Sequence, residues 1–409
     1  MKILQINVTA NSGSTGRIAE GIGKTAMDAG HESWVAYGRF ANPSTSRLIR
    51  IASRWNCLEH GIESRLFDNH GLASRSATRA FLKQVDDIRP DIIHLHNIHG
   101  YYLNYKILFN YLKKLNVPVV WTLHDCWPFT GHCTYFTACS CDKWKKGCFS
   151  CPQKKSYPAS FFWDRASKNY EEKKLCYNSI SNLTIVSVSH WLDNLVSHSF
   201  LKKHNHIVIH NGIDTDLFTP SSNAKQIRKK HGIIDDETML LGVASTWDER
   251  KGLCDFIELS NRLPPQKKII LIGLNKKQIY SLPHNIIGVE RTESMQEMAE
   301  YYSAADIVLN LSKEETFGMT TIEGFACGTP VIGYNNTATP ELITCKTGLI
   351  VQEKRMDQLI NAIDNIASQG KEHFSTFCRQ QAVTCYNQNS VFSKYLDLYN
   401  TLFCSEQKL

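Results

Sequence analysis

Residues 312–332 of the chain read SKEETFGMTTIEGFACGTPVI and combine a glycine-containing loop with two carboxylates. The apolar run before the loop, residues 306–311, predicts a buried parallel strand. Residues 320–327 predict a helix, which a Gly-Thr-Pro sequence ends. Glu315 would then follow the carboxyl end of a strand, and Glu323 would lie about one turn into the next helix. Open α/β sheets bind ligands at that position, where N–H groups at a helix start can hold an anion.

Two glutamates at this spacing also occur as solvated carboxylates beside an ordinary helix. The full string favours the functional interpretation, because it resembles the E-x7-E signature of retaining glycosyltransferases of family 4. In this chain the signature reads Glu315, then TFGMTTI, then Glu323, then GFACGTPVI. The family has the GT-B fold, so the resemblance implies an α/β protein with two Rossmann-like domains facing across a cleft.

Length and composition agree with this class of protein. A chain of 409 residues is too long for one ordinary core and suits two α/β domains of about 200 residues each. No apolar run approaches the roughly 20 residues of a membrane-spanning helix, and the start, MKILQINVTA, lacks the apolar stretch of a secretory signal. We therefore expect a cytoplasmic protein. The net charge of +7 favours small anionic ligands or an anionic membrane surface and does not by itself indicate nucleic acid.

The predicted domain organisation follows the GT-B fold. We expect an N-terminal, acceptor-side domain at residues 1–205, a hinge at 206–219 and a C-terminal, nucleotide-sugar-binding domain at 220–383. A final helix, residues 384–409, is expected to return to the first domain. In the hinge, the side chain of Asp214 can fix a turn through bonds to backbone N–H groups.

The N-terminal domain begins with a predicted strand, residues 2–8, and a glycine-containing turn, residues 10–17. Gly13 and Gly16 would let the backbone approach a ligand closely, and Arg17 could meet a phosphate or a carboxylate. Many turns without a ligand have the same composition. The family places a similar loop at its cleft, which makes both glycines candidates for donor binding.

Several histidines follow strands of this domain. His94 is interpreted as structural, with His96 and His99 near the cleft, and a metal site is the minor alternative. His124 and Asp125 resemble the family's TxHD motif, in which the histidine lies beside the donor sugar. His124 could donate a hydrogen bond to a sugar hydroxyl or contact the leaving phosphate, while Asp125 could orient the acceptor or form a capping bond. A histidine that merely ends a strand is the alternative.

Six of the fourteen cysteines fall within an insertion expected at about residues 126–152. The last two form a C-x2-C knuckle, whereas the spacing of the others fits a metal site only in part, and Cys141 is the alternative to Cys139. Four thiolates around zinc would stabilise an insertion without a core of its own. Free thiols are the alternative. The prediction is a structural zinc site formed by Cys133, Cys139, Cys148 and Cys151.

The same insertion carries the string HDCWPFTGHC…WKKGCFSCPQ, which resembles a bacterial polysaccharide-type subgroup of the family, such as the colanic acid glycosyltransferases. It would lie over the acceptor side of the cleft. Its Lys143, Trp144, Lys145 and Lys146 are candidates for contact with lipid headgroups or an anionic acceptor, and a solvated basic turn is the alternative. These lysines and Lys202–Lys203, with the habit of the family, predict peripheral attachment to the inner face of the plasma membrane.

The C-terminal domain contains the string STWDERKG before a predicted helix. Arg250 and Lys251 are suited to a diphosphate, since one offers a fork of N–H groups and the other a point charge. The family shows GR, a short loop and KG here, but Ser245 or Thr246 stands where its arginine would fall. Whether Arg250 replaces that arginine stays open. One charge-assisted hydrogen bond contributes about 1.5–3 kcal/mol, so without a replacement for this arginine the affinity for the donor would be lower.

The resemblance implies a retaining glycosyltransferase of the hexosyltransferase type. It would move a sugar from a nucleotide-diphosphate sugar to a polysaccharide precursor or a lipid-linked saccharide. Glu323 would hold the ribose hydroxyls and Glu315 would accept from a hydroxyl of the donor sugar. The predicted catalytic residues are His124, Arg250, Lys251 and Glu315. The predicted donor-binding residues are Gly13, Gly16, Phe317, Gly318, Met319, Thr320 and Glu323.

No DxD-type pair for a catalytic metal stands out, so we expect transfer without a metal or other cofactor, with front-face attack by the acceptor rather than a covalent glycosyl–glutamate. A GT-B-type sugar-nucleotide epimerase or phosphorylase is one alternative. A catalytically inactive, zinc-stabilised binding module is another, supported by the missing arginine. Nucleic acid is not an expected partner, because no basic stripe with aromatic residues occurs. The base, the sugar, the acceptor and the oligomeric state are left open by the sequence.

Overall fold

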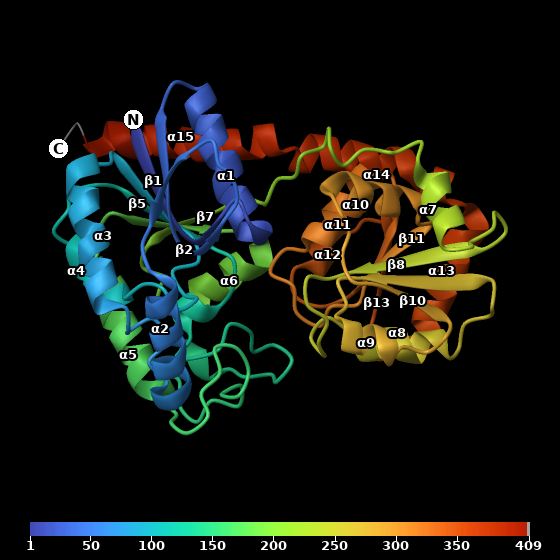
Figure 1. Cartoon of the computed structure of the whole chain (residues 1–409), viewed down its shortest axis with the longest axis horizontal. Helices are drawn as coiled ribbons and strands as arrows, with labels where there is room; N and C mark the ends of the chain where they lie inside the picture. The colour runs from blue at the N-terminus through green and yellow to red at the C-terminus, as the bar shows by residue number, and fades with distance from the viewer. Residues whose placement is uncertain (407–409) are drawn as a thin grey trace. The chain divides into compact units, whose positions relative to one another are not determined.

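The computed structural model describes residues 1–406, and the chain divides into two compact units. Unit 1 comprises residues 1–210 together with the last helix from Asn389 onward, and unit 2 comprises Asn211–Gln388. Each unit is built on a parallel sheet covered by helices (Figure 1). The end of the predicted C-terminal helix, residues 407–409, lies outside the described residues. Within residues 1–406, no helix has both the length and the apolar character of a membrane span.

Unit 1 contains a seven-stranded sheet in the order β3-β2-β1-β4-β5-β6-β7. Its central strands are almost wholly buried, as expected for a parallel sheet covered on both faces. The direction of winding reverses between β1 and β4, which creates a topological switch point at the carboxyl ends of these neighbours. The strands are β1 (Lys2–Ala10), β2 (Glu32–Ala41), β3 (Arg47–Arg50), β4 (Ile92–Leu95), β5 (Val119–Leu123), β6 (Leu183–Ser187) and β7 (Asn205–Val208).

Helices cover both faces of this sheet. Helices α1 and α15 share one core with it, through side chains such as Ile18 and Phe392. On the other face, Phe109 of α4 and Tyr177 of α5 pack on Trp121 of β5. The helices are α1 (Gly13–Asp28), α2 (Arg54–Phe67), α3 (Arg75–Ile88), α4 (Tyr105–Leu112), α5 (Ala166–Tyr177), α6 (His190–His198) and α15 (Gln388–Glu406), with 3-10 turns at Trp127–Phe129 and Lys143–Lys145.

The first helix begins earlier than the sequence predicts. The turn expected at residues 10–17 is limited to residues 11 and 12, because α1 starts at Gly13. Gly16 therefore lies inside the helix, where an added Cβ would be 2.7 Å from the Thr9 hydroxyl oxygen. The missing side chain of Gly16 thus serves the packing of α1 against β1.

Unit 2 contains a six-stranded sheet in the order β10-β9-β8-β11-β12-β13, with its switch point between β8 and β11. The strand predicted at 306–311 and the helix predicted at 320–327 are present as β11 and α11. The strands are β8 (Thr238–Val243), β9 (Lys267–Ile272), β10 (Ile286–Val289), β11 (Ile307–Asn310), β12 (Val331–Tyr334) and β13 (Gly348–Val351). The helices are α7 (Ala224–Lys230), α8 (Leu253–Ser260), α9 (Lys276–Tyr280), α10 (Met295–Ala304), α11 (Met319–Ala326), α12 (Thr339–Leu342), α13 (Met356–Gln369) and α14 (Lys371–Tyr386).

The chain passes from unit 1 into unit 2 directly after β7. Residues 206–208, which the sequence places in the hinge, belong to this strand. Asp214 Oδ1 accepts hydrogen bonds from the N–H groups of Asp216 and Leu217, both at 3.0 Å, and these are the side-chain to backbone bonds predicted for it. Ile213 pairs with Asn387 in a short parallel bridge, so the beginning and the end of unit 2 lie side by side.

Candidate active site

The cations and one carboxylate predicted to act on a donor meet in unit 2. Arg250 and Lys251 lie on the loop after β8, and Glu315 lies on the loop after β11. These strands are hydrogen-bonded neighbours, so both loops leave the same edge of the sheet at its switch point. Lys251 Nζ forms an ion pair with Glu315 Oε1. Open α/β sheets bind ligands at such a position.

The Lys251–Glu315 pair is largely shielded from solvent, with 18% and 12% of the two side chains exposed. Burial alone would raise the pKa of Glu315, but the charge and hydrogen bond of Lys251, a hydrogen bond from Ser312 and the charge of Arg250 together bring that pKa below its ordinary value. The carboxylate is therefore ionised at neutral pH. Its backbone N–H donates to the Thr337 hydroxyl at 2.9 Å, which fixes the loop.

The two loops are also joined by their backbones. The Lys313 N–H donates to the Arg250 carbonyl at 2.8 Å, and Arg250 Nη1 donates to the Glu314 carbonyl at 3.3 Å. Gly252 has φ +76°, and a Cβ there would lie 2.3 Å from the Leu311 carbonyl oxygen. Only glycine permits this approach, which explains the Lys-Gly sequence that brings Lys251 to Glu315.

Helix α11 begins beside Glu315. Gly318 precedes it with φ +105°, a left-handed conformation that favours glycine. Phe317 is buried, and its ring packs 5.8 Å from that of Tyr386. Met319 and Thr320 form the first turn, whose N–H groups point toward the N-terminal end of the helix. The start of α11 thus offers backbone N–H groups and a helix dipole to an anion.

Glu323 lies one turn further along α11 and is only 9% exposed. The Tyr302 hydroxyl, from α10, donates to Glu323 Oε2 at 2.7 Å. Tyr302 is itself anchored, because the Thr329 hydroxyl donates to its carbonyl at 2.6 Å. The carboxylate is thus oriented by a phenol that the sequence reasoning missed. No spacing signal marks Tyr302, since it reaches Glu323 from a different helix.

In unit 1, His124 is the end of a relay of side chains at the edge of the sheet. Its ring stacks on that of His96 at 5.4 Å, and His124 Nε2 lies 3.2 Å from His96 Nδ1. His96 Nε2 lies 3.0 Å from Gln5 Oε1, while Gln5 Nε2 donates to the Ala19 carbonyl at 2.7 Å. The Gln5 oxygen can only accept, so His96 Nε2 carries the proton and His96 Nδ1 accepts from His124.

This relay determines which ring nitrogen of His124 carries the proton. Burial lowers the pKa of His124 to about 4, although Asp125 acts in the opposite direction. Burial also lowers the pKa of His96 well below its ordinary value. Both imidazoles are therefore neutral at pH 7, and the proton of His124 is on Nε2 toward His96. In this tautomer Nδ1 carries a lone pair and can accept a hydrogen bond, and the role of His124 beside the donor sugar stays a prediction.

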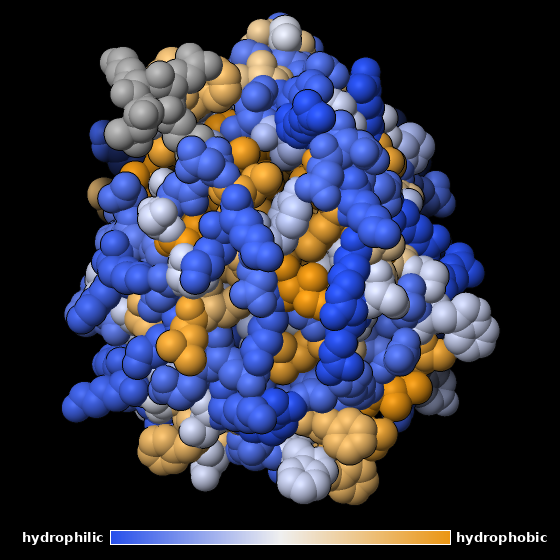
Figure 2. All heavy atoms as spheres, turned by 90° about the vertical axis from the view of Figure 1, so that its left-hand side faces the viewer, coloured by the Kyte–Doolittle hydropathy of each residue, from blue (hydrophilic) through white to orange (hydrophobic). Residues whose placement is uncertain are grey.

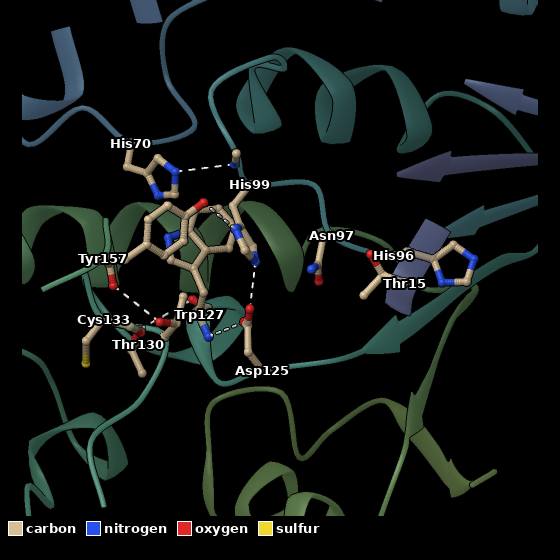
Figure 3. A network of polar contacts seen from close by, with 12 residues as sticks. Thr15, His70, His96, Asn97, His99, Asp125, Trp127, Thr130, Cys133 and Tyr157 are labelled. Atoms are coloured by element: carbon tan, nitrogen blue, oxygen red, sulfur yellow. Dashed lines mark hydrogen bonds and ion pairs between the residues drawn. The ribbon is translucent and has the colours of Figure 1, made fainter. Parts of the chain in front are cut away.

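Asp125 holds the chain after β5 through a side-chain to backbone bond, as one of its two predicted roles requires. Its other predicted role, orienting the acceptor, stays a prediction. Figure 3 shows the His99 ring pointing toward this carboxylate. His99 Nε2 lies 2.8 Å from Asp125 Oδ2, and the Trp127 N–H donates to Oδ1 at 2.9 Å. His99 Nδ1 lies 3.2 Å from the Tyr157 hydroxyl. Asp125 thereby connects the edge of the sheet to the insertion at residues 126–152, which we call the cysteine-rich segment.

The two predicted glycines of unit 1 differ in their surroundings. Gly13 has φ +66° and no heavy atom within 4 Å of an added Cβ, whereas Gly16 is packed against β1. Beside Gly13, Asn7 Nδ2 donates to the Thr15 hydroxyl at 3.3 Å. The Asn97 N–H donates to Asn7 Oδ1 at 3.3 Å, which joins the loops that follow β1 and β4. Gly13 alone retains the open surroundings that a ligand would need.

The predicted cysteine set is only partly brought together. Cys133, Cys148 and Cys151 line one small cavity with Cys141, whereas Cys139 is exposed and its thiol contacts the Phe136 carbonyl at 3.1 Å. Cys139 therefore does not belong to this cluster. Within residues 1–406, no group of three or more histidine, cysteine or acidic side chains is placed to hold a metal ion. Zinc at the cluster stays a prediction, with Cys141 in place of Cys139.

Trp144 does not have the exposed position that contact with headgroups requires. It is 2% exposed and packs against Phe129 and Phe136, with ring centroids 5.4 and 5.1 Å away. An indole surrounded by rings supports the fold of the segment. The expectation that Trp144 meets lipid is therefore wrong, although the lysines beside it, Lys145 and Lys146, are exposed.

Two family models match the chain over most of its length. Residues 15–217 match the model described as Glycosyltransferase Family 4, and residues 223–377 match the model described as Glycosyl transferases group 1. The chain therefore belongs to these glycosyltransferases. Its two parallel α/β units have the GT-B fold of its structural neighbours.

Individual relatives agree with this assignment. The chain is 23% identical to WcaC of Escherichia coli, a glycosyl transferase named for colanic acid biosynthesis, over 98% of its own length and all of that protein. Its structure is similar to sucrose-phosphate synthase of Thermosynechococcus elongatus, with a TM-score of 0.73, 19% identity and 99% of both chains covered. It is also similar to HepE of Anabaena in complex with UDP-glucose, with a TM-score of 0.65 and 16% identity over 98% and 100% of the two chains. At such identities the structural likeness shows the fold alone.

Proposed function

We propose that this glycosyltransferase is a retaining, metal-independent hexosyltransferase that uses a nucleotide-diphosphate sugar. Its acceptor is a polysaccharide precursor or a lipid-linked saccharide. The observation that carries the proposal is the meeting of Lys251, Arg250, Glu315 and the start of α11 at the switch point of unit 2. The complex of the neighbour HepE with UDP-glucose and the name of the relative WcaC support the choice of donor and of acceptor.

In this proposal, the diphosphate binds between the two loops of unit 2. It competes with Glu315 for Lys251, and Arg250 lies beside both. As the diphosphate leaves, Lys251 and Arg250 stabilise the charge that develops on it, and such preorganised groups commonly supply a large part of catalysis. Glu315, released from Lys251, accepts a hydrogen bond from a hydroxyl of the donor sugar.

The remaining groups of unit 2 position the donor. The backbone N–H groups of Phe317, Gly318, Met319 and the following residue, Thr320, hold sugar and phosphate oxygens at the start of α11. Glu323 accepts hydrogen bonds from the two ribose hydroxyls, and the Tyr302 hydroxyl keeps its carboxylate in the required orientation. Two vicinal hydroxyls suit one carboxylate, because its two oxygens can accept in parallel.

The groups of unit 1 act on the sugar side of the reaction. His124 Nδ1 accepts from a sugar hydroxyl, while its Nε2–H remains bonded to His96. Gly13 gives the backbone at the start of α1 room beside a ligand. The acceptor hydroxyl attacks the anomeric carbon from the face that the diphosphate leaves. The new carbon–oxygen bond forms as the bond to the diphosphate breaks, and the hydroxyl proton passes to an oxygen of the departing diphosphate, so the anomeric configuration is retained without a protein nucleophile.

A transfer assay tests the proposal. Purified protein is incubated in EDTA with UDP-, GDP- or ADP-hexoses and a panel of lipid-linked saccharides, and the anomeric configuration of the product is read by NMR. We expect one donor to be used with retention and Glu315→Gln to abolish turnover. Inversion, a strict need for a divalent cation, or turnover of the donor into an epimer without an acceptor would each overturn the proposal.

A further inference from the structure

Thr337 has a backbone conformation that its side chain disfavours. Among residues 1–406, nine residues other than glycine have a positive φ, and Thr337, with φ +51°, is the only one of them with a β-branched side chain. A branched Cβ makes the left-handed region an outlying conformation. Such strain persists only where surrounding contacts maintain it, and it is concentrated at functional sites.

The contacts that maintain this conformation lead to Glu315. Thr337 lies on the loop after β12, and its hydroxyl accepts from the Glu315 N–H at 2.9 Å. The N–H of the next residue, Ala338, donates to the Glu315 carbonyl at 3.2 Å. Two consecutive residues therefore pair with both backbone groups of Glu315. The turn at Thr337 directs its hydroxyl and the following N–H toward the same partner.

The loop after β12 is itself fixed on its other side. The Asn335 N–H donates to the Val351 carbonyl of β13 at 2.8 Å, and Asn336 Nδ2 donates to Glu353 Oε2 at 2.9 Å. The Thr337 hydroxyl is thus presented to Glu315 from an anchored loop. Groups that are preorganised in this way need no rearrangement during a reaction.

The strand order places a neighbouring loop on each side of Glu315. In the sheet of unit 2, β11 lies between β8 and β12. Lys251, after β8, holds the carboxylate of Glu315, whereas Thr337, after β12, holds its backbone. In the proposed function the diphosphate competes for Lys251. The bonds from the loop after β12 then remain to keep Glu315 in position.

Glycine would adopt the conformation of Thr337 without strain. Gly252 and Gly318, on the loops after β8 and β11, have φ +76° and +105°. These two loops of the site therefore reach positive φ with no side chain. At residue 337 the chain carries a threonine instead, and glycine would lack the hydroxyl that accepts from Glu315.

We propose that Thr337 is a positioning residue of this transferase, whose strained turn holds Glu315 where its carboxylate meets the donor sugar. The inference rests on the proposed function and adds to it a residue from a third loop. Loss of the hydroxyl should slow the transfer step and leave nucleotide affinity unchanged, because Lys251, Arg250 and Glu323 are the side chains proposed to hold the nucleotide.

Three substitutions separate the hydroxyl from the strain. Thr337→Gly removes both, Thr337→Val removes the hydroxyl alone, and Thr337→Ser keeps the hydroxyl. We expect kcat to fall about tenfold in the glycine and valine variants, since one hydrogen bond is lost, whereas the serine variant should retain most of the activity. Calorimetric affinity for the nucleoside diphosphate should be unchanged in all three. Tm should fall in Thr337→Val, where the strain persists, but not in Thr337→Gly.

Arg89→Gly is the matched control, because Arg89 also has a positive φ, +53°, but belongs to unit 1. It follows α3, on the side of that unit that Figure 2 shows, where hydrophilic side chains cover most of the surface. This variant should keep the kcat of the wild type. Relief of a left-handed conformation would then not by itself lower activity.

The outcomes distinguish this inference from the proposed function. Wild-type kcat in Thr337→Gly, or an equal loss of kcat in Thr337→Ser, would overturn the inference and leave the proposed function intact. A lower Tm together with weaker nucleotide binding in Thr337→Gly would also overturn it, because Thr337 would then have a structural role alone. A wild-type protein without turnover on any donor would refute the proposed function and this inference with it.

Discussion

Replacing Lys251 by methionine should destabilise the protein, because it leaves Glu315 as a shielded carboxylate without its main partner. Removing one member of a buried ion pair typically costs about 3–5 kcal/mol. Here Ser312 and Arg250 still favour the ionised carboxylate, and 18% of the lysine side chain reaches solvent. We therefore expect a loss of about 2–3 kcal/mol. For a unit of this size that loss lowers Tm by roughly 5–10 °C.

Calorimetric unfolding of four proteins measures this effect: wild type, Lys251→Met, Glu315→Gln and the double variant. The double variant should recover most of the stability lost in Lys251→Met, because it removes the unpaired charge. The pH dependence has a definite sign. The pKa of Glu315 is lowered in the folded protein, so the ionised carboxylate contributes stability above its ordinary pKa of 4.5, and this contribution is lost as pH falls through the folded value.

The Tm difference between wild type and Lys251→Met should accordingly shrink as the pH falls below 4.5. Lys251→Arg serves as a matched control, since it keeps the charge and should retain most of the stability. An unchanged Tm in Lys251→Met, or losses in the double variant that simply add, would show that Lys251 and Glu315 do not act as a pair.

Glu323→Ala should weaken binding of the donor nucleotide about 10- to 100-fold, because two hydrogen bonds to a charged acceptor are lost; unchanged calorimetric affinity would contradict its ribose role. His96→Leu leaves the His124 Nε2–H without its acceptor, so turnover should fall about tenfold while nucleotide affinity, which depends on unit 2, stays constant. If the cysteine cluster holds structural zinc, metal analysis should find zinc in wild type and Cys139→Ser but little in Cys141→Ser. Wild-type protein free of zinc would refute that site.

Much of unit 2 can be predicted from sequence for a physical reason. Its strands are buried on both faces and therefore read as continuous apolar runs. The E-x7-E string sits between one such run and a helix, so chain order alone places Glu315 at the end of β11. Lys251 is predicted just before a helix, and the structure shows that its loop follows β8, the neighbour of β11. The ion pair between Lys251 and Glu315 could not be predicted, because it depends on which strands are neighbours and the sequence does not give strand order.

Other features depend on contacts between distant segments. The Tyr302 hydroxyl reaches Glu323 from a separate helix, and Gln5 reaches His96 across neighbouring strands. Neither polar residue differs in its local pattern from an ordinary core residue. The resemblance to the family therefore indicated the groups proposed to touch the substrate but not the groups that orient them.

Contacts within the cysteine-rich segment were also not predictable from local spacing, because this segment has little regular secondary structure. Cys139 and Cys141 are two residues apart, and sequence spacing could not decide between them, whereas the fold turns only Cys141 into the cavity. Trp144 lies among lysines in the sequence, yet its ring packs inward against Phe129 and Phe136. In an irregular segment, the direction of a side chain is determined by tertiary packing, because no helical or strand periodicity determines it.

The central claim is that unit 2 binds the nucleoside diphosphate of a sugar donor, and calorimetric titration with UDP, GDP and ADP in the absence of metal tests it most directly. We predict that one of the three binds clearly tighter than the others and that Lys251→Met and Glu323→Ala each weaken that binding. If none of the three binds wild-type protein, the loops after β8 and β11 do not form a donor site, and the proposed transfer reaction is wrong.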